Sequence, residues 1–267
     1  MADASFDAAT GEFSRLCAII RELRQRCPWD REQTITGLGR HLIEEAYEAL
    51  DAIERDETAA IVDELGDVIA QALAIGVIAE ENGRFTVAQV MGAAADKLVR
   101  RHPHVYAGAA ANSAAEVIEN WERIKRDERD RAGAKSALDG VARALPALTR
   151  AEKLGERARA AGMDWRDIHD VLAKVREEMD EVEGALAADD LGAAAAEIGD
   201  MMLALANAPR FIGDRAEETL RRACDKFVAR FGQVERLAAA RGLMLRALAP
   251  AELDALWNEA KRAAKSG

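Results

Sequence analysis

The sequence predicts an all-α protein made of two tandem helical bundles. Its 267 residues are 49% hydrophobic and 32% charged, and aromatic residues make up only 4%. This composition is typical of a globular chain. It favours helices over a β-sandwich or barrel, because Ala, Leu, Glu and Arg are strong helix formers. A pattern of five acidic residues and a glycine also occurs twice, 133 residues apart, which indicates a duplicated domain.

Net charge and cysteine content exclude several classes of protein. The net charge of −11 argues against direct nucleic-acid binding, because such proteins are normally basic. Three cysteines without a close pair predict free thiols rather than a disulfide framework or a zinc site. The apolar stretch 68–79 is too short to cross a membrane, and the N-terminus lacks a signal-peptide pattern. We therefore expect a cytoplasmic protein without a membrane partner.

Apolar residues recur at the spacing of amphipathic helices along most of the chain. The first 11 residues are small and polar and are expected to be frayed. A loop is expected at 34–39, Thr58 can cap a helix, and Asn82-Gly83 is typical of a helix C-terminus. The expected helices cover residues 13–27, 41–53, 58–79, 86–101, 114–129, 148–160, 168–187, 190–207, 214–240 and 250–264.

The stretch 131–146 divides the chain, because Gly, Ser and Pro interrupt the helical pattern there. The order of elements then restarts. We expect an N-terminal helical domain at 12–130, a linker at 131–146 and a C-terminal helical domain at 147–262.

The repeated acidic pattern predicts a metal site on two successive helices. In the later copy, Glu178 and Glu181 are neighbours one turn apart, and Glu197 and Asp200 are three apart on the next helix. The short connection between these helices makes them antiparallel, so the carboxylates converge across their seam. Oxygen ligands without His or Cys suit Mg²⁺ or Mn²⁺. A second possible metal site in the earlier copy comprises Glu45, Glu48, Glu64 and Asp67.

Other interpretations of the acidic pattern are weaker. A single Glu-rich helix is usually a solvated surface, and only the repetition favours a site. A di-iron bundle needs Glu-x-x-His pairs, which the four histidines do not supply. Gly66 and Gly199, each just before the final Asp, are costly inside a helix and predict close approach of another backbone or a ligand.

Basic residues near the later copy favour a polyphosphate ligand. Lys174 precedes the acidic pattern by one turn, and Lys226 and Arg230 lie four apart on a later helix. Such groups hold phosphate oxygens, and Trp257 can stack on a base. Taken singly, the Lys226–Arg230 pair fits a solvated face and Trp257 fits a core position. The earlier copy has His41 in place of Lys174, which weakens its grip on phosphate at neutral pH.

Four motifs together resemble the MazG family of tandem-domain nucleoside triphosphate pyrophosphohydrolases. They are Cys27-Pro28-Trp29-Asp30, Leu42-Ile43-Glu44-Glu45-Ala46-Tyr47-Glu48, Glu64-Leu65-Gly66-Asp67 and Arg101-His102-Pro103-His104-Val105. The Glu-Glu-x-x-Glu and Glu-x-x-Asp pair is the signature of the wider all-α pyrophosphohydrolase superfamily. The resemblance covers residues 12–262 and identifies both predicted domains as MazG-like bundles.

The resemblance implies a homodimer that hydrolyses NTP or dNTP to the monophosphate and pyrophosphate with Mg²⁺, as house-cleaning of the nucleotide pool or regulation of nucleotide and alarmone levels. In tandem relatives, activity is ascribed mainly to the C-terminal copy. The implied metal ligands are Glu178, Glu181, Glu197 and Asp200. The implied nucleotide contacts are Lys125, Lys174, Glu177, Glu178, Lys226, Arg230 and Trp257. Residues 193–196 are all alanine where relatives often carry charge, so no contact is carried over to them.

The mechanistic hypothesis is attack of water on the α-phosphorus, with pyrophosphate as the leaving group. Glu177, which has no metal role, is the candidate to orient or deprotonate the water. The expected catalytic residues are Glu177, Glu178, Glu181, Glu197 and Asp200. The alternative is a non-catalytic helical module that binds nucleotide or a protein partner. A narrower enzymatic alternative acts on dUTP, an oxidised nucleotide or an alarmone.

Overall fold

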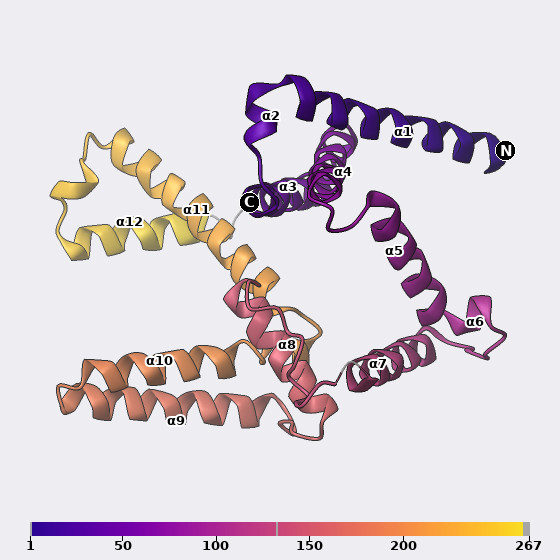
Figure 1. The fold of residues 1–267 in the computed structure, drawn as a ribbon. Coiled ribbons are helices and arrows are strands. Elements are labelled where there is room, and N and C mark those ends of the chain that lie inside the picture. The colour runs from indigo at the N-terminus through magenta and orange to yellow at the C-terminus, as the bar shows by residue number, and fades with distance from the viewer. Residues whose placement is uncertain (1, 132, 264–267) are drawn as a thin grey trace. The chain divides into compact units, whose positions relative to one another are not determined.

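The computed structural model describes residues 2–131 and 133–263, and every regular element in these ranges is helical, as predicted (Figure 1). The chain divides into two compact units, Met1–Lys125 and Arg126–Gly267. The predicted domain limits and the predicted linker at 131–146 stay predictions. Residue 132 of the linker lies outside the described ranges. No described helix is long and apolar enough to cross a membrane.

The first unit is built around a helical hairpin, α3 (Ile35–Glu54) and α4 (Thr58–Glu81). α1 (Ala2–Arg26) packs against α4. Buried apolar side chains from α1, α4 and the start of α5 form its core. These residues are Cys17, Ile20, Leu73, Val77 and Val87. The other helices are α2 (Pro28–Glu32), α5 (Val87–Arg101), α6 (Pro103–Tyr106) and α7 (Ala114–Arg131), which runs past the end of the unit.

Several helix boundaries in this unit correct the sequence-based expectation. Residues 2–11 belong to α1 rather than fraying, in keeping with their four alanines. The expected loop at 34–39 is the first turn of α3, because Thr34 Oγ1 accepts a hydrogen bond from the Gly37 amide at 3.1 Å and caps the helix. Thr58 is the first residue of α4 and makes no cap. The additional helices α2 and α6 each begin at a proline, whose fixed φ suits the first helical position.

The second unit repeats the hairpin in α9 (Ile168–Ala187) and α10 (Leu191–Leu205), which lie side by side and antiparallel (Figure 1). Aspartates fix both N-termini. Asp167 accepts hydrogen bonds from the amides of His169 and Asp170, and Asp190 accepts one from the Ala193 amide at 2.9 Å. The α9 boundaries match those predicted.

The rest of the second unit is arranged around α11 (Ala216–Ala240). α8 (Ala147–Ala160) and α12 (Pro250–Ala263) both pack against it, and residue 264 of the predicted last helix lies outside the described ranges. The α11–α12 core contains Val234, Ala238, Leu256 and Ala260. Two short 3-10 helices, η1 (Pro209–Ile212) and η2 (Leu245–Ala247), lie in the connections.

Glu80, near the end of α4, joins three helices of the first unit. Its Oε1 accepts a hydrogen bond from the Val87 amide at 2.7 Å, and its Oε2 accepts one from Arg21 Nη2 at 2.9 Å. The Val87 amide and then Arg21 hold the pKa of Glu80 below its usual value of 4.5. A lowered pKa stabilises the fold above the unfolded value, and this contribution is lost as the pH falls through the lowered folded value.

We therefore expect Glu80→Gln to melt at a lower temperature than the wild type at neutral pH. The gap should close as the pH falls through the lowered folded pKa of Glu80, below which the wild-type carboxylate is also protonated. Thermal melts of both proteins between neutral pH and about pH 3 would test this. A gap that does not change with pH would rule out a role for the charge.

Candidate functional site

The seam between α9 and α10 holds a cluster of carboxylates. One oxygen each of Glu178, Glu197 and Asp200 lie within 4.8 Å of one another. Glu181 is in hydrogen-bonding contact with Glu178. Glu178 is buried, with 4% of its surface exposed, whereas Asp200 and Glu181 are exposed. The structure thus brings together three of the four metal ligands that the sequence predicts for the later copy, and the fourth, Glu181, lies beside them.

Helix register places Glu178 in this seam. Val171, which is fully buried, lies two turns earlier on the same face of α9. The packing that buries Val171 therefore also turns Glu178 toward α10. Burying a carboxylate is costly unless a cation compensates it, so the position of Glu178 indicates that a positive charge belongs there.

Lys174 supplies part of that charge. Its Nζ lies 2.7 Å from Glu177 Oε1 and 2.7 Å from Glu178 Oε1. Glu177 and then Glu178 raise the pKa of Lys174 well above its usual value, so it stays protonated. In return, Lys174 lowers the pKa of Glu178.

The remaining negative charge is crowded. Contact with Glu178, together with partial loss of solvent around the carboxylate, raises the pKa of Glu181, because two adjacent carboxylates resist double ionisation. A divalent cation would remove this repulsion, and a site of oxygen donors alone fits a hard ion such as Mg²⁺ or Mn²⁺. The donor chemistry of the cluster therefore fits the expected metal.

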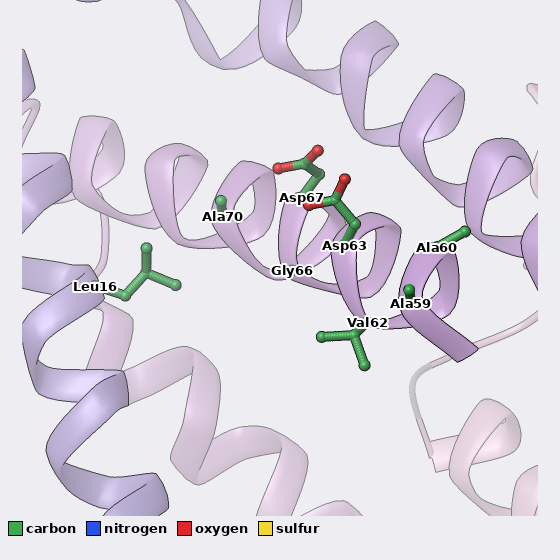
Figure 2. A pocket seen from close by; sticks show the side chains of 8 residues that line it. All are labelled: Leu16, Ala59, Ala60, Val62, Asp63, Gly66, Asp67 and Ala70. Atoms are coloured by element: carbon green, nitrogen blue, oxygen red, sulfur yellow. The ribbon is translucent and has the colours of Figure 1, made fainter. Parts of the chain in front are cut away.

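The earlier copy assembles a corresponding cluster. Oxygens of Glu45, Glu48 and Glu64 lie within 4.8 Å of one another on α3 and α4. Asp67 is not among them. It lines an open groove of about 570 Å³ beside α1, where Figure 2 shows it next to Asp63. As in the later copy, three of the four predicted residues form the tight cluster, and the fourth, here Asp67, lies close enough to Glu64 to raise its pKa.

The basic residue beside the acids also differs between the copies. His41 Nδ1 lies 2.9 Å from Glu44 Oε2, and no ion pair with Glu45 is found among the described residues. Lys174, its counterpart, pairs with two glutamates. The later copy therefore has the stronger permanent positive charge at its cluster.

Three predicted nucleotide contacts lie away from the α9–α10 seam within one chain. Lys226 and Arg230 belong to α11 and Trp257 to α12, and these helices pack mainly against each other and α8. Trp257 lies against Phe227, with 5.4 Å between ring centroids, at the edge of the α11–α12 core. A nucleotide that uses all of these residues therefore needs more than the contacts of a single chain.

Lys125, the fourth predicted contact outside the hairpin, belongs to the first unit. Its Nζ lies 2.7 Å from Glu122 Oε1 and 5.8 Å from the ring centre of Trp121. These contacts hold an ammonium group at the surface of α7 without burying it.

The glycines of the two acidic motifs have open space around them. No atom of the described chain lies within 4 Å of the position that a Cβ would occupy at Gly66 or Gly199. The expected close approach of another backbone is therefore wrong for this chain. Both positions have room for a ligand or for a second copy of the chain.

Two polar residues absent from the sequence prediction lie beside Lys226 and Arg230. Gln233 and Arg236 line the same groove of α11. Helical spacing could have identified Gln233 from the sequence, because it follows Lys226 by seven residues, or two turns, on the same face.

Comparison with known proteins gives consistent similarities. Residues 33–106 match the MazG nucleotide pyrophosphohydrolase domain. The chain is 41% identical over 256 residues to the nucleoside triphosphate pyrophosphohydrolase of Escherichia coli K12, covering 94% of this chain and 97% of that protein. It is 36% identical to the nucleoside triphosphate pyrophosphohydrolase/pyrophosphatase MazG of Thermotoga maritima, and the match covers 93% of this chain and 95% of that protein. A crystal structure of a mazG-related protein from Thermotoga maritima is 26% identical in sequence and has a TM-score of 0.38. The match covers 42% of this chain and 98% of that protein's chain.

Proposed function

This chain belongs to the MazG family of nucleoside triphosphate pyrophosphohydrolases, and from that premise we propose that the carboxylate cluster between α9 and α10 is its active site. The enzyme hydrolyses nucleoside triphosphates to the monophosphate and pyrophosphate, as house-cleaning of the nucleotide pool. The observation that supports this site is the convergence of Glu178, Glu197 and Asp200 within 4.8 Å, with Lys174 beside them. Quantifying monophosphate and pyrophosphate from NTP with the wild-type protein tests the reaction.

The reaction depends on a metal ion, and we propose Mg²⁺, with Mn²⁺ as a substitute. Glu178, Glu181, Glu197 and Asp200 would hold it. When bound, the ion offsets negative charge on the α- and β-phosphate oxygens. Because the carboxylate of Glu178 raises the pKa of Glu181, a bound cation would lower that pKa by offsetting the repulsion.

The remaining roles fall to side chains around the cluster. Glu177 is exposed, lies one turn from Glu181 on α9 and forms an ion pair with Lys174, so it can orient or deprotonate the attacking water. Lys174 stays charged and can bind a phosphate oxygen. Lys226 and Arg230 would hold the outgoing pyrophosphate.

The nucleotide has two further proposed contacts, both taken from the family resemblance. Trp257 would stack on the base, and Lys125 would contact the phosphates. The pairing of Lys125 with Glu122 would then be exchanged for a pairing with substrate.

We also propose that the enzyme is a homodimer. Large apolar side chains of the α9–α10 hairpin are exposed in the single chain, which is typical of a protein interface. They are Met179, Leu186, Ile198, Met202, Leu203 and Leu205. A second copy would cover them and could carry its α11 and α12 contacts toward the cluster.

Sedimentation equilibrium should therefore give twice the chain mass of 28.9 kDa. Met202→Glu should shift the mass toward the monomer and lower activity, because it places a charge in the covered face. A fully active wild-type monomer would contradict the dimer.

The N-terminal cluster is expected to contribute less to activity. A variant with Glu45→Ala and Asp67→Ala should keep pyrophosphate release within about tenfold of the wild type, because His41 replaces the lysine beside this cluster. Steady-state pyrophosphate release measures this. A loss as large as that of a C-terminal cluster variant would place the chemistry in both copies.

The enzyme names of the relatives favour catalysis over the non-catalytic alternative. Preference among canonical, deoxy, oxidised and alarmone substrates is tested by steady-state rates across a nucleotide panel. The cytoplasmic location stays a prediction.

A further inference from the structure

A row of cationic side chains lines a groove of about 390 Å³ between α11 and α12. The side chains on the α12 side are small, so the groove is open to a ligand. No carboxylate is among the lining residues. Its polar lining comes from Lys226, Arg230, Gln233 and Arg236, and its apolar lining from Ala229, Ala260 and Ala263.

These cations lack the carboxylate partners that others in the second unit have. Lys174, Arg222 and Arg241 each form an ion pair with an acidic side chain. Within the described ranges, Lys226 and Arg230 form none. The Nε of Arg230 is buried without a hydrogen-bond partner, which is rare for a buried polar atom. In a chain with a net charge of −11, such a groove is a local site for anions.

The side chain of Arg236 turns back into this groove. Its Nε donates a hydrogen bond to Gln233 Oε1 at 3.0 Å. Its Nη1 lies 3.5 Å from the position that a Cβ would occupy at Gly232, so the guanidinium points back along α11 toward the preceding turns, where Arg230 lies. Lys226, Arg230 and Gln233 share one helix face, because they are spaced by four and three residues.

We propose that Arg236, held in place by Gln233, recognises the terminal phosphate and makes the enzyme select nucleoside triphosphates over diphosphates. This rests on the proposed function, in which Lys226 and Arg230 hold the outgoing pyrophosphate. Three cations along a helix match the three phosphates of the substrate. A planar guanidinium adds charge-assisted hydrogen bonds that only a further phosphate can accept.

Calorimetric titration of the full chain with ATP and with ADP, both without divalent metal, tests the groove directly, because ADP lacks the terminal phosphate. Arg236→Gln should weaken ATP binding by about tenfold and leave ADP binding within about twofold. Arg241→Gln is the matched control, because it removes the same charge from the end of the same helix, where Arg241 already pairs with Glu259 at 2.7 Å. It should leave both affinities unchanged. Equal loss for the two anions, or no loss, would overturn the proposal.

Kinetics gives the second readout. With Arg236→Gln, kcat/KM should fall about tenfold for NTP and stay unchanged for NDP, and Arg236→Lys should recover part of the loss. An equal fall for both nucleotides would overturn the specificity role. The two proposals fail separately. A wild-type protein that releases no pyrophosphate would refute the function, while the calorimetry would still test the groove.

Discussion

Glu178→Gln is expected to abolish pyrophosphate release, with a fall in kcat/KM of at least about a thousandfold. Glu178 is the buried member of the cluster, with an oxygen within 4.8 Å of those of Glu197 and Asp200. The amide keeps the shape of the side chain but removes the charge that a divalent ion needs. Asp200→Asn on the facing helix should have a comparable effect.

The variant should stay folded, which separates loss of chemistry from loss of structure. Removing one of several crowded carboxylates relieves repulsion, and Lys174 keeps its ion pair with Glu177. The metal-free variant should melt modestly below the wild type, because it loses the ion pair between Glu178 and Lys174, and it should lose the rise in Tm that Mg²⁺ gives the wild type.

Asp180→Asn is the matched control, because Asp180 is exposed on the same helix and outside the cluster. It should retain wild-type activity and the metal-dependent rise in Tm. Full activity in both Glu178→Gln and Asp200→Asn would remove the C-terminal cluster from the reaction.

Gly155→Ala should lower the free energy of unfolding by about 1–3 kcal/mol, the cost of overpacking a core. A Cβ at this position of α8 would lie 1.8 Å from Oδ1 and 2.8 Å from Cγ of Asn207. Asn207 has little room to move, because only 2% of its surface is exposed and its Nδ2 donates a hydrogen bond to the Leu203 carbonyl at 3.0 Å. Denaturant unfolding followed by circular dichroism measures the loss.

Gly184→Ala is the control for helix propensity. Gly184 lies inside α9 with nothing within 4 Å of the position that a Cβ would occupy, so the change should stabilise the protein by up to about 1 kcal/mol. Combining Gly155→Ala with Asn207→Ala should recover part of the stability, because the clashing side chain is gone. Wild-type stability in Gly155→Ala alone would contradict the packing of α8 on Asn207.

Helices with a sustained apolar period could be predicted from the sequence. α9 has the predicted boundaries, and α8 begins one residue earlier than predicted. The misses occurred where local hydrogen bonds or proline decide the backbone. Thr34 starts α3 by capping it, and Pro28 starts α2, although apolar periodicity carries no signal for either.

The candidate site was predictable to the extent that it follows helix spacing. The acids at 178, 197 and 200 met because the connection between α9 and α10 is short. The fourth acid of each copy, Asp67 or Glu181, lies outside the three clustered oxygens, and residue spacing alone does not reveal this. Arg236 was missed because its side chain folds back along α11 to Gln233, which residue spacing alone does not reveal.

The central claim is that water attacks the α-phosphorus at the α9–α10 cluster. Hydrolysis of NTP in ¹⁸O-labelled water, followed by mass spectrometry of the products, tests it most directly. We predict that the label enters the monophosphate, that it does so equally with Glu45→Ala, and that incorporation disappears with Glu178→Gln. Label in pyrophosphate, or undiminished incorporation with Glu178→Gln, would contradict the account.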